Sequence, residues 1–155
     1  MLDNIIEDES FADLMQSNIQ NLIIYMFEKE QNFGLLCKIE DASFEPALPT
    51  EIYSGFRPMT LFFLAGYTFE TARIVDDSIV FEAGFGADNI GSLVTVPLLS
   101  IMQIIIDETP VLINLASYTK QNKVNKEIER IDDNGVENSM ASFLSNPENA
   151  KFLKK

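Results

Sequence analysis

The residues of this chain that could do chemistry are mainly carboxylates, because the sequence has no histidine and one cysteine, Cys37. Histidine is the commonest general base, the usual partner of serine and cysteine nucleophiles, and the commonest metal ligand. Carboxylates alone could bind a cation, but the alternating acidic loop closed by a glutamate that is typical of calcium sites is not in the sequence. The sequence therefore predicts a protein that is not an enzyme and that needs no metal or other cofactor.

Three glycines, Gly84, Gly86 and Gly91, form the one pattern that could suggest a nucleotide site. A dinucleotide fingerprint needs a strand, a glycine turn, and then a helix whose N-terminus binds the pyrophosphate. Here the loop after Gly86 is expected to lead back into a strand, and the third glycine is misplaced. We therefore expect these glycines to let a strand bend or another backbone approach closely. Cys37 is expected to be a buried thiol on a strand.

The negative charge of the chain is concentrated in its first 116 residues. Residues 1–116 hold four basic and eighteen acidic residues, a net charge of −14, whereas residues 117–155 hold seven basic and six acidic residues. An acidic body repels phosphate backbones and anionic lipid surfaces, so neither nucleic acid nor membrane is an expected partner. The expected partners are neutral or basic protein surfaces, or peptides held by backbone and apolar contacts.

The first expected element is an amphipathic helix from Ser10 to about residue 30. Ser10 is the expected N-cap, preceded by acids that suit the positive end of the helix dipole. Apolar residues recur every three or four positions and form a wide stripe. That stripe would pack against a sheet or against a second copy of the helix; it comprises Phe11, Leu14, Met15, Ile19, Leu22, Ile23, Met26 and Phe27.

After Gly34 the pattern is typical of short strands joined by turns. A loop with Pro46 and Pro49 follows the first strand, and Pro97 favours one helical turn. One helix followed by such strands predicts an α+β fold whose small antiparallel sheet is bent into a barrel or half-barrel. The segments with strand character are 35–39, 59–64, 68–74, 79–85, 93–96, 102–106 and 111–115.

Residues 117–155 are rich in Asn, Lys, Glu and Asp and predict a polar, flexible tail. Residues 146–148 read Asn-Pro-Glu, a pattern that starts helices, so a short terminal helix packed on its own domain is the alternative. The sequence shows no secretory signal and no apolar run long enough to span a membrane. Because the lone cysteine also suits a reducing compartment, a cytoplasmic location is expected.

Two segments carry a resemblance to a known family. Residues 80–86 read Val-Phe-Glu-Ala-Gly-Phe-Gly, and residues 94–105 read Val-Thr-Val-Pro-Leu-Leu-Ser-Ile-Met-Gln-Ile-Ile. This pair resembles the SspB family, the adaptors that bring ssrA-tagged substrates to the ClpXP unfoldase-protease. In that family a hydrophobic-Phe-x-Ala-x-Phe-Gly strand is followed by a loop and a Val-x-Val-Pro segment. The upstream order of elements also agrees, so the resemblance spans about residues 12–116.

The resemblance implies a small, bent Sm-like half-barrel that dimerises through its N-terminal helix and binds an extended peptide tag in an apolar groove. Ala83 would form the floor of that groove. The other implied peptide-binding residues are Phe81, Phe85, Gly86, Leu61 and Phe63. The implied dimer interface comprises Phe11, Met15, Ile19, Leu22 and Met26.

The end of the chain, Phe152, Leu153, Lys154 and Lys155, resembles the short apolar-basic motif with which this family docks on the unfoldase, ClpX. The chain also departs from the family. Its linker is short and near neutral rather than strongly acidic, and Gly84 stands where the family often has Arg. The alternative hypothesis is a non-enzymatic interaction or assembly module of the same fold with a different protein partner.

Overall fold

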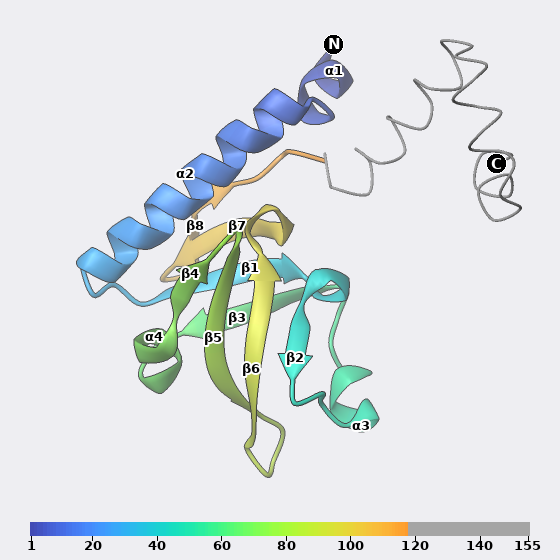
Figure 1. The fold of residues 1–155 in the computed structure, drawn as a ribbon, viewed down its shortest axis with the longest axis vertical. Coiled ribbons are helices and arrows are strands. Elements are labelled where there is room, and N and C mark those ends of the chain that lie inside the picture. The colour runs from blue at the N-terminus through green and yellow to red at the C-terminus, as the bar shows by residue number, and fades with distance from the viewer. Residues whose placement is uncertain (118–155) are drawn as a thin grey trace, which may run out of the picture. The chain divides into compact units, whose positions relative to one another are not determined.

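A computed structural model of the protein describes residues 1–117. Two N-terminal helices precede two four-stranded antiparallel sheets (Figure 1). The α+β class expected from the sequence is therefore confirmed. The expected tail and its docking motif, Phe152 to Lys155, lie outside the described residues.

Helix α2 (Glu9–Glu28) follows a short helix, α1 (Leu2–Ile6), and is capped by Asp8 rather than by the expected Ser10. The Asp8 carboxylate accepts a hydrogen bond from the Phe11 N–H at 3.2 Å, which satisfies one of the free donors of the first turn. At the other end Glu30 adopts a positive φ, and the Gln31 N–H donates to the Met26 carbonyl at 2.9 Å. This is the Schellman arrangement, here with a glutamate in the place usually taken by glycine.

The eight strands divide into two sheets, and each sheet combines strands from early and late parts of the described chain. In the first sheet the order is β3 (Met59–Leu64), β1 (Phe33–Lys38), β7 (Ile101–Ile106) and β8 (Thr109–Ile113). In the second sheet the order is β2 (Ser43–Glu45), β6 (Ile90–Pro97), β5 (Ser78–Phe85) and β4 (Arg73–Val75). The helical turn expected after Pro97 is present as a 3-10 turn, Leu98–Ser100.

Several boundaries differ from those expected. The alternating segment 68–74, expected to be a strand, is instead a helix, α4 (Tyr67–Thr71), followed by β4. The helical turn lets Phe69 pack edge-on against Phe27 and Phe33, at 5.8 and 6.2 Å between ring centroids. Strand β8 starts at Thr109, before Pro110, and such a proline is tolerated because β8 is an edge strand. Strand β2 and helix α3 (Thr50–Tyr53) fall in segments where no element was expected, and the turn Ile39–Asp41 begins at the residue expected to end the first strand.

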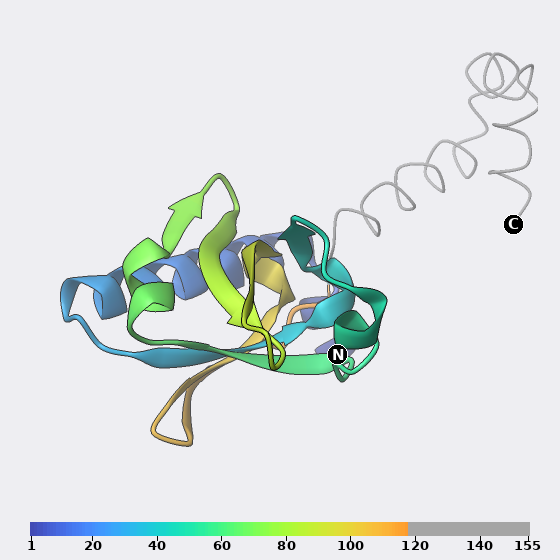
Figure 2. The same cartoon turned by 90° about the horizontal axis from the view of Figure 1, so that it is seen from below.

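The core lies between the two sheets, and α2 covers one end of it (Figure 2). Residues from α2 and both sheets form one buried cluster, in which Phe62 of β3 meets Phe81 of β5 at 5.5 Å between ring centroids. Cys37 is buried in this cluster on β1, as expected. The buried Asn114 side chain is satisfied, since its amide donates to the carbonyls of Leu99 and Ile101. The segment after β8 is fastened to α1 by a hydrogen bond of 2.7 Å from the Ser117 N–H to the Ile6 carbonyl.

Candidate functional site

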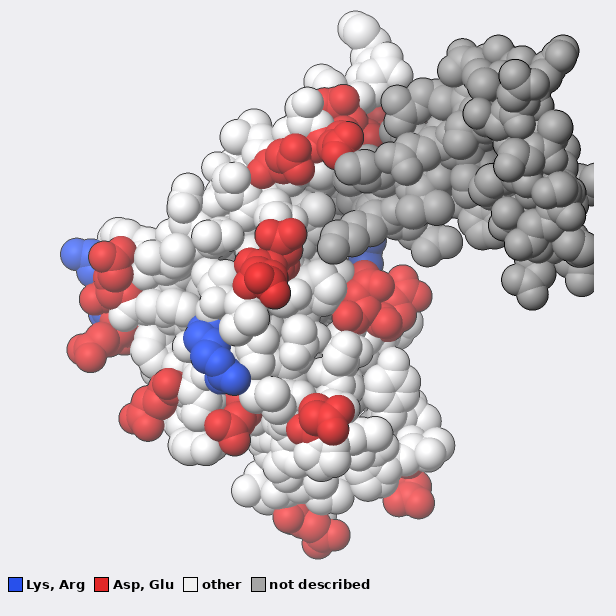
Figure 3. All heavy atoms as spheres, in the orientation of Figure 1, with Lys and Arg blue, Asp and Glu red and all other residues white. Residues whose placement is uncertain are grey.

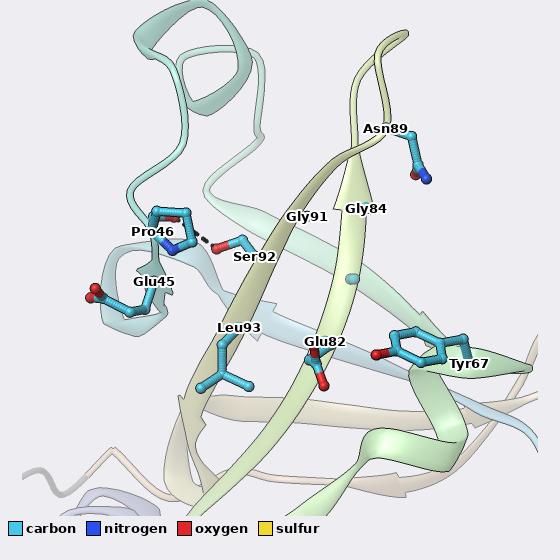
Figure 4. A pocket seen from close by; sticks show the side chains of 10 residues that line it. Glu45, Pro46, Tyr67, Glu82, Gly84, Asn89, Gly91, Ser92 and Leu93 are labelled. Carbon is cyan, nitrogen blue, oxygen red and sulfur yellow. Dashed lines mark hydrogen bonds between the residues drawn. The ribbon is translucent and has the colours of Figure 1, made fainter.

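A hollow of about 410 Å³ lies on the outer face of the second sheet. Strand β5 shows which face this is, because Phe81 is buried in the core whereas Glu82 and Gly84, on the opposite side of the strand, are exposed. The hollow extends from the end of β2 across β6 and β5 to α4 (Figure 4). The residues that line it are Glu45, Pro46, Tyr67, Glu82, Ala83, Gly84, Asn89, Gly91, Ser92 and Leu93.

The floor of the hollow carries no side chain of its own at one cross-strand pair, Gly84 and Gly91, although the Asn89 amide folds over Gly84. A Cβ at Gly84 would overlap the amide of Asn89, so this position can hold only glycine while Asn89 folds over it. A Cβ at Gly91 would meet no atom within 4 Å and would point into open space. The sequence-based expectation that these glycines let a strand bend or another backbone approach closely stays a prediction, because the neighbour at Gly84 is the Asn89 side chain and Gly91 faces open space.

One wall of the hollow is a row of three side chains on neighbouring strands. In the sheet register Leu93 of β6 lies directly opposite both Glu45 of β2 and Glu82 of β5. Figure 4 shows Leu93 between the two carboxylates. The β2 end of the wall is held by Ser92, whose hydroxyl donates to the Pro46 carbonyl at 2.9 Å.

The edge of β5 beside the hollow is covered at Glu82 and has no partner strand at Gly84. Strand β4 pairs with β5 only as far as Val80, and at Glu82 the backbone N–H donates instead to the Thr71 hydroxyl at 2.9 Å. The N–H of Glu82 thus points away from β6. Because backbone groups of a strand alternate in direction, Gly84 also directs its N–H and carbonyl to this side. Among residues 1–117 no strand pairs with β5 there, so these groups are free to bond to an added strand.

Aromatic side chains hold the end of β5 from beneath. Phe85 contacts Phe44 and Phe56 with ring centroids 5.6 and 5.9 Å away. The turn that follows begins at Gly86, which has a φ of +75° and approaches the side chain of Ile52. The strand edge is therefore presented by a packed support rather than by a loose hairpin.

Of the six expected peptide-binding residues, the structure places only Ala83 at the hollow. Phe81 is fully buried in the core, so its assignment to a peptide-contacting surface is wrong: it supports β5 from inside. Phe85 and Gly86 flank the hollow without lining it. Leu61 and Phe63, 54% and 62% exposed, lie on the outer face of β3 in the other sheet. They do not belong to this site.

The expected dimer residues divide between two faces of α2. Ile19 and Met26 are buried within their own domain, so their assignment to an interface between copies is wrong. Phe11, Met15 and Leu22 are half-buried on one flank of the helix. The same flank carries Leu14 and Tyr25, which are 56% and 53% exposed. The wide stripe seen in the sequence is thus a buried face joined to a partly exposed one.

Most of the lining residues could not be identified from the sequence. Tyr67 comes from a helix where a strand was expected, and Glu45 comes from a strand where a loop was expected. The available signal was the pair Gly84 and Gly91, because glycines opposite one another in a hairpin leave a gap on one face of a sheet.

The described residues hold no arrangement for catalysis that we recognise. Within residues 1–117 no three acidic, cysteine or histidine side chains are grouped so as to hold a metal ion. Burial raises the pKa of the Cys37 thiol far above its usual value, so the reactive thiolate does not form at neutral pH. Among the helices of this part of the chain, none is both long enough and apolar enough to cross a membrane.

Comparison with known proteins adds no assignment, because the sequence matches no protein-family model and no curated protein.

Proposed function

We propose that this protein binds extended peptides in the hollow beside β5 and acts as an SspB-like adaptor that delivers tagged proteins to a ClpXP-type unfoldase-protease. One observation carries the proposal: the unpaired edge of β5 at Gly84 adjoins a hollow whose floor is glycine backbone. Main-chain hydrogen bonds to a free strand edge supply affinity for an extended peptide, and pockets for alternate side chains supply specificity.

The resemblance supports the same segment of the chain. The residues that resemble the family's groove strand, 80–86, fall on β5 and the start of its turn, and Ala83 lines the hollow. The two antiparallel sheets are compatible with a bent Sm-like half-barrel. A binding role also agrees with the acidic body, which disfavours nucleic acid as a ligand.

The adaptor proposal includes a homodimer and a docking segment. The dimer would use the partly exposed flank of α2, in which positions 11, 15, 18, 22 and 25 repeat at alternating steps of four and three. Such a repeat forms a seam between helices, and the polar Asn18 in it would fix the register. The segment from Phe152 to Lys155 would bind the unfoldase, and tethering would raise the local concentration of cargo without new contacts.

The direct test is fluorescence anisotropy with a labelled ssrA-type peptide and the full-length protein. Saturable binding is expected, together with faster degradation of a tagged substrate by ClpXP. Deleting Phe152 to Lys155 is expected to leave peptide binding unchanged and to remove the stimulation of degradation. If a folded protein shows no saturable binding of extended peptides, the adaptor proposal is wrong.

A second candidate function is an interaction or assembly module of the same fold. One observation favours it: the outer face of β3 exposes Met59, Leu61 and Phe63 together, and large exposed apolar side chains in a cluster mark interaction surfaces. Replacing Leu61 and Phe63 by Ser distinguishes the two. An adaptor that uses the hollow keeps its peptide affinity after this change, whereas an assembly module loses its association with its protein partner.

A further inference from the structure

We infer that the outer face of the first sheet binds the same face of a second copy of this chain, about a two-fold axis that runs across the strands. This goes beyond peptide binding, because the hollow lies on the second sheet. The inference is carried by an exposed apolar face and by the opposite charges at its two ends.

The side of the first sheet that faces away from the core is largely apolar. Leu35 and Cys37 of β1 are buried in the core, so the alternate residues of this strand stand on the outer side. In Figure 2 helix α2 and the second sheet lie above β1 and β3, on the side opposite to this face. The sheet register defines the outer face as Leu36 and Lys38 of β1, Met59, Leu61 and Phe63 of β3, Gln103 and Ile105 of β7, and Ile113 of β8.

The described residues leave much of this outer face open to solvent. Leu61, Phe63 and Ile113 are 54%, 62% and 55% exposed. Leu61 extends over the neighbouring strand, because a Cβ at Gly34 of β1 would lie 3.0 Å from its Cδ1 atom. Large apolar side chains that are exposed together mark an interaction surface.

The outer face differs in charge from the rest of the described domain. Lys38 is its only charged residue, and none of the eighteen acids of residues 1–116 belongs to it. On the side that carries the second sheet, by contrast, acidic side chains are scattered over the surface (Figure 3). Depletion of charge is typical of the centre of a protein–protein interface.

The two ends of the outer face carry opposite charges. Lys38 lies at the end where β3 begins, and Arg57 precedes β3 at the same end. Asp107 and Glu108 form the β7–β8 turn at the other end, since β7 is antiparallel to β1 and ends beside its first residues. The acidic turn Ile39–Asp41 after β1 leads away from the face, because Ile39 is buried in the core.

A second copy of the same face is complementary to this arrangement. When two such faces stack about a two-fold axis across the strands, each end of one face lies over the opposite end of the other. Lys38 of one copy then lies near the acidic β7–β8 turn of its partner, and the same attraction occurs twice in the pair. The apolar centres meet as the inner faces of two sheets do in a β-sandwich.

The size of the outer face indicates a weak association. Four strands about 4.8 Å apart, each of about six residues, give a face of roughly 400 Å². Two faces would bury roughly 800 Å² before the relief of the side chains is counted, whereas stable interfaces bury about 1,200–2,000 Å². We therefore expect the pairing to appear as the protein concentration rises. It leaves both hollows open to peptide, because they lie on the second sheet.

The test is sedimentation equilibrium of the full-length Leu14→Asp chain over a range of loading concentrations. Leu14→Asp dissociates the proposed α2 dimer, so the association that remains reports on another surface. This chain is expected to be a monomer at low concentration and to form a dimer as the concentration rises. Adding Phe63→Asp is expected to lower the association constant by more than about ten-fold, because the new charge enters the interface twice. Adding Val75→Asp is the matched control and is expected to change nothing, since Val75 is 45% exposed on β4 of the second sheet.

Exchanging the end charges tests the two-fold arrangement. Lys38→Glu and Glu108→Lys are each expected to lower the association constant by about five-fold, because an attraction becomes a repulsion at two places in the pair. The variant with both substitutions is expected to recover the association, since opposite charges again face each other.

Three results would overturn the inference. If the Leu14→Asp chain stays a monomer at every concentration, the outer face is covered by another partner or by residues 118–155 of its own chain. The other two are a Phe63→Asp chain that associates undiminished and a double charge exchange that recovers nothing. Peptide anisotropy on the same preparations keeps the two proposals apart. Lost association with intact peptide binding overturns only this inference, and the reverse result overturns only the proposed peptide binding.

Discussion

Filling the hollow at Gly91 is the most direct test of the site. A Cβ at this position would meet no atom within 4 Å, so the side chain of Gly91→Val starts into open space and we expect the domain to keep its fold. Gly91 lies within β6, where a β-branched residue is favoured over glycine. The substitution therefore acts on the space that a ligand would occupy and not on the packing that maintains the fold.

Gly91→Val is expected to change two quantities, the affinity for peptide and the stability of the domain. The valine side chain would stand inside the hollow of about 410 Å³, because Gly91 is one of the lining residues and has open space above it. It would stand on the glycine floor, in the space that the side chains of a strand added at the β5 edge would enter, and peptide affinity is expected to fall by more than about ten-fold. Replacing glycine within a strand is expected to raise stability by about 0.5–1 kcal/mol, or about 2–5 °C in Tm.

The assay measures peptide affinity by anisotropy and Tm by circular dichroism on the same preparations. Thr95→Val is the matched control, because Thr95 lies on the same strand and the same face as Gly91 but does not line the hollow. It is expected to keep full affinity. If Gly91→Val binds peptide as well as the native protein does, the peptide does not lie on the glycine floor, and the assignment of the site is refuted.

Four further predictions concern the fold and the assembly. Asp8→Ala is expected to lower the free energy of unfolding by about 1 kcal/mol in urea titration, because it removes the N-cap of α2, whereas Asp13→Ala within the helix is not. Phe81→Ala is expected to lower the free energy of unfolding by about 3–5 kcal/mol and Phe63→Ala by less than about 1 kcal/mol, since Phe81 is buried and Phe63 is 62% exposed. Equal losses in the two variants would contradict the placement of Phe81. Burial holds the pKa of Cys37 above that of the unfolded thiol. The contribution of Cys37 to stability is therefore complete below the unfolded pKa of ~8.5, and above that pH the free energy of unfolding falls by about 1.4 kcal/mol per pH unit. Cys37→Ala is expected to remove this dependence of stability on pH. Sedimentation equilibrium is expected to show a dimer that Leu14→Asp dissociates and Ile24→Asp, on the opposite flank of α2, does not; a native monomer at high concentration would disprove the dimer.

The fold could be predicted where a long segment keeps a regular spacing of apolar residues, or where a proline marks a turn. Helix α2 and strand β3 were located from their apolar patterns, and the turn after Pro97 from the proline. The N-cap was misplaced because both Asp8 and Ser10 are good caps. Only the tertiary position of the first turn decides between them.

The site could be predicted only in part, because its residues come together through sheet register. Ala83 was identified through the resemblance, and the glycines were singled out, although as points where a strand bends or another backbone approaches. Glu45, however, reaches the hollow only because β2 pairs with β6 at Leu93, a contact between residues 48 positions apart in the sequence. No local pattern contains that pairing. Phe81 was misassigned for a different reason: alternation along β5 defines two faces, and only the packing of the two sheets decides which face is buried.

The structure also changes which substitution isolates peptide binding. By its residue type Ala83 invites replacement with a larger side chain such as glutamine. Its side chain, however, packs against the core cluster, on the same side of β5 as Phe81. A glutamine there would disturb packing and polar satisfaction as well as any bound peptide, so a loss of binding would have two explanations. Gly91 has only one.

Helix α4 explains why the segment that was misassigned from sequence is the one that completes the site. Residues 68–74 alternate as a strand does, and a longer strand here would pair with β5 along its whole edge and leave no place for a ligand. As a helix, the segment instead packs Phe69 into the aromatic core, and β4 begins only at Arg73. Thr71 then takes one donor of the edge at Glu82, while Tyr67 closes the side of the hollow. The open edge of β5 at Gly84 is therefore a consequence of a chain that folds as a helix where its pattern would permit a strand.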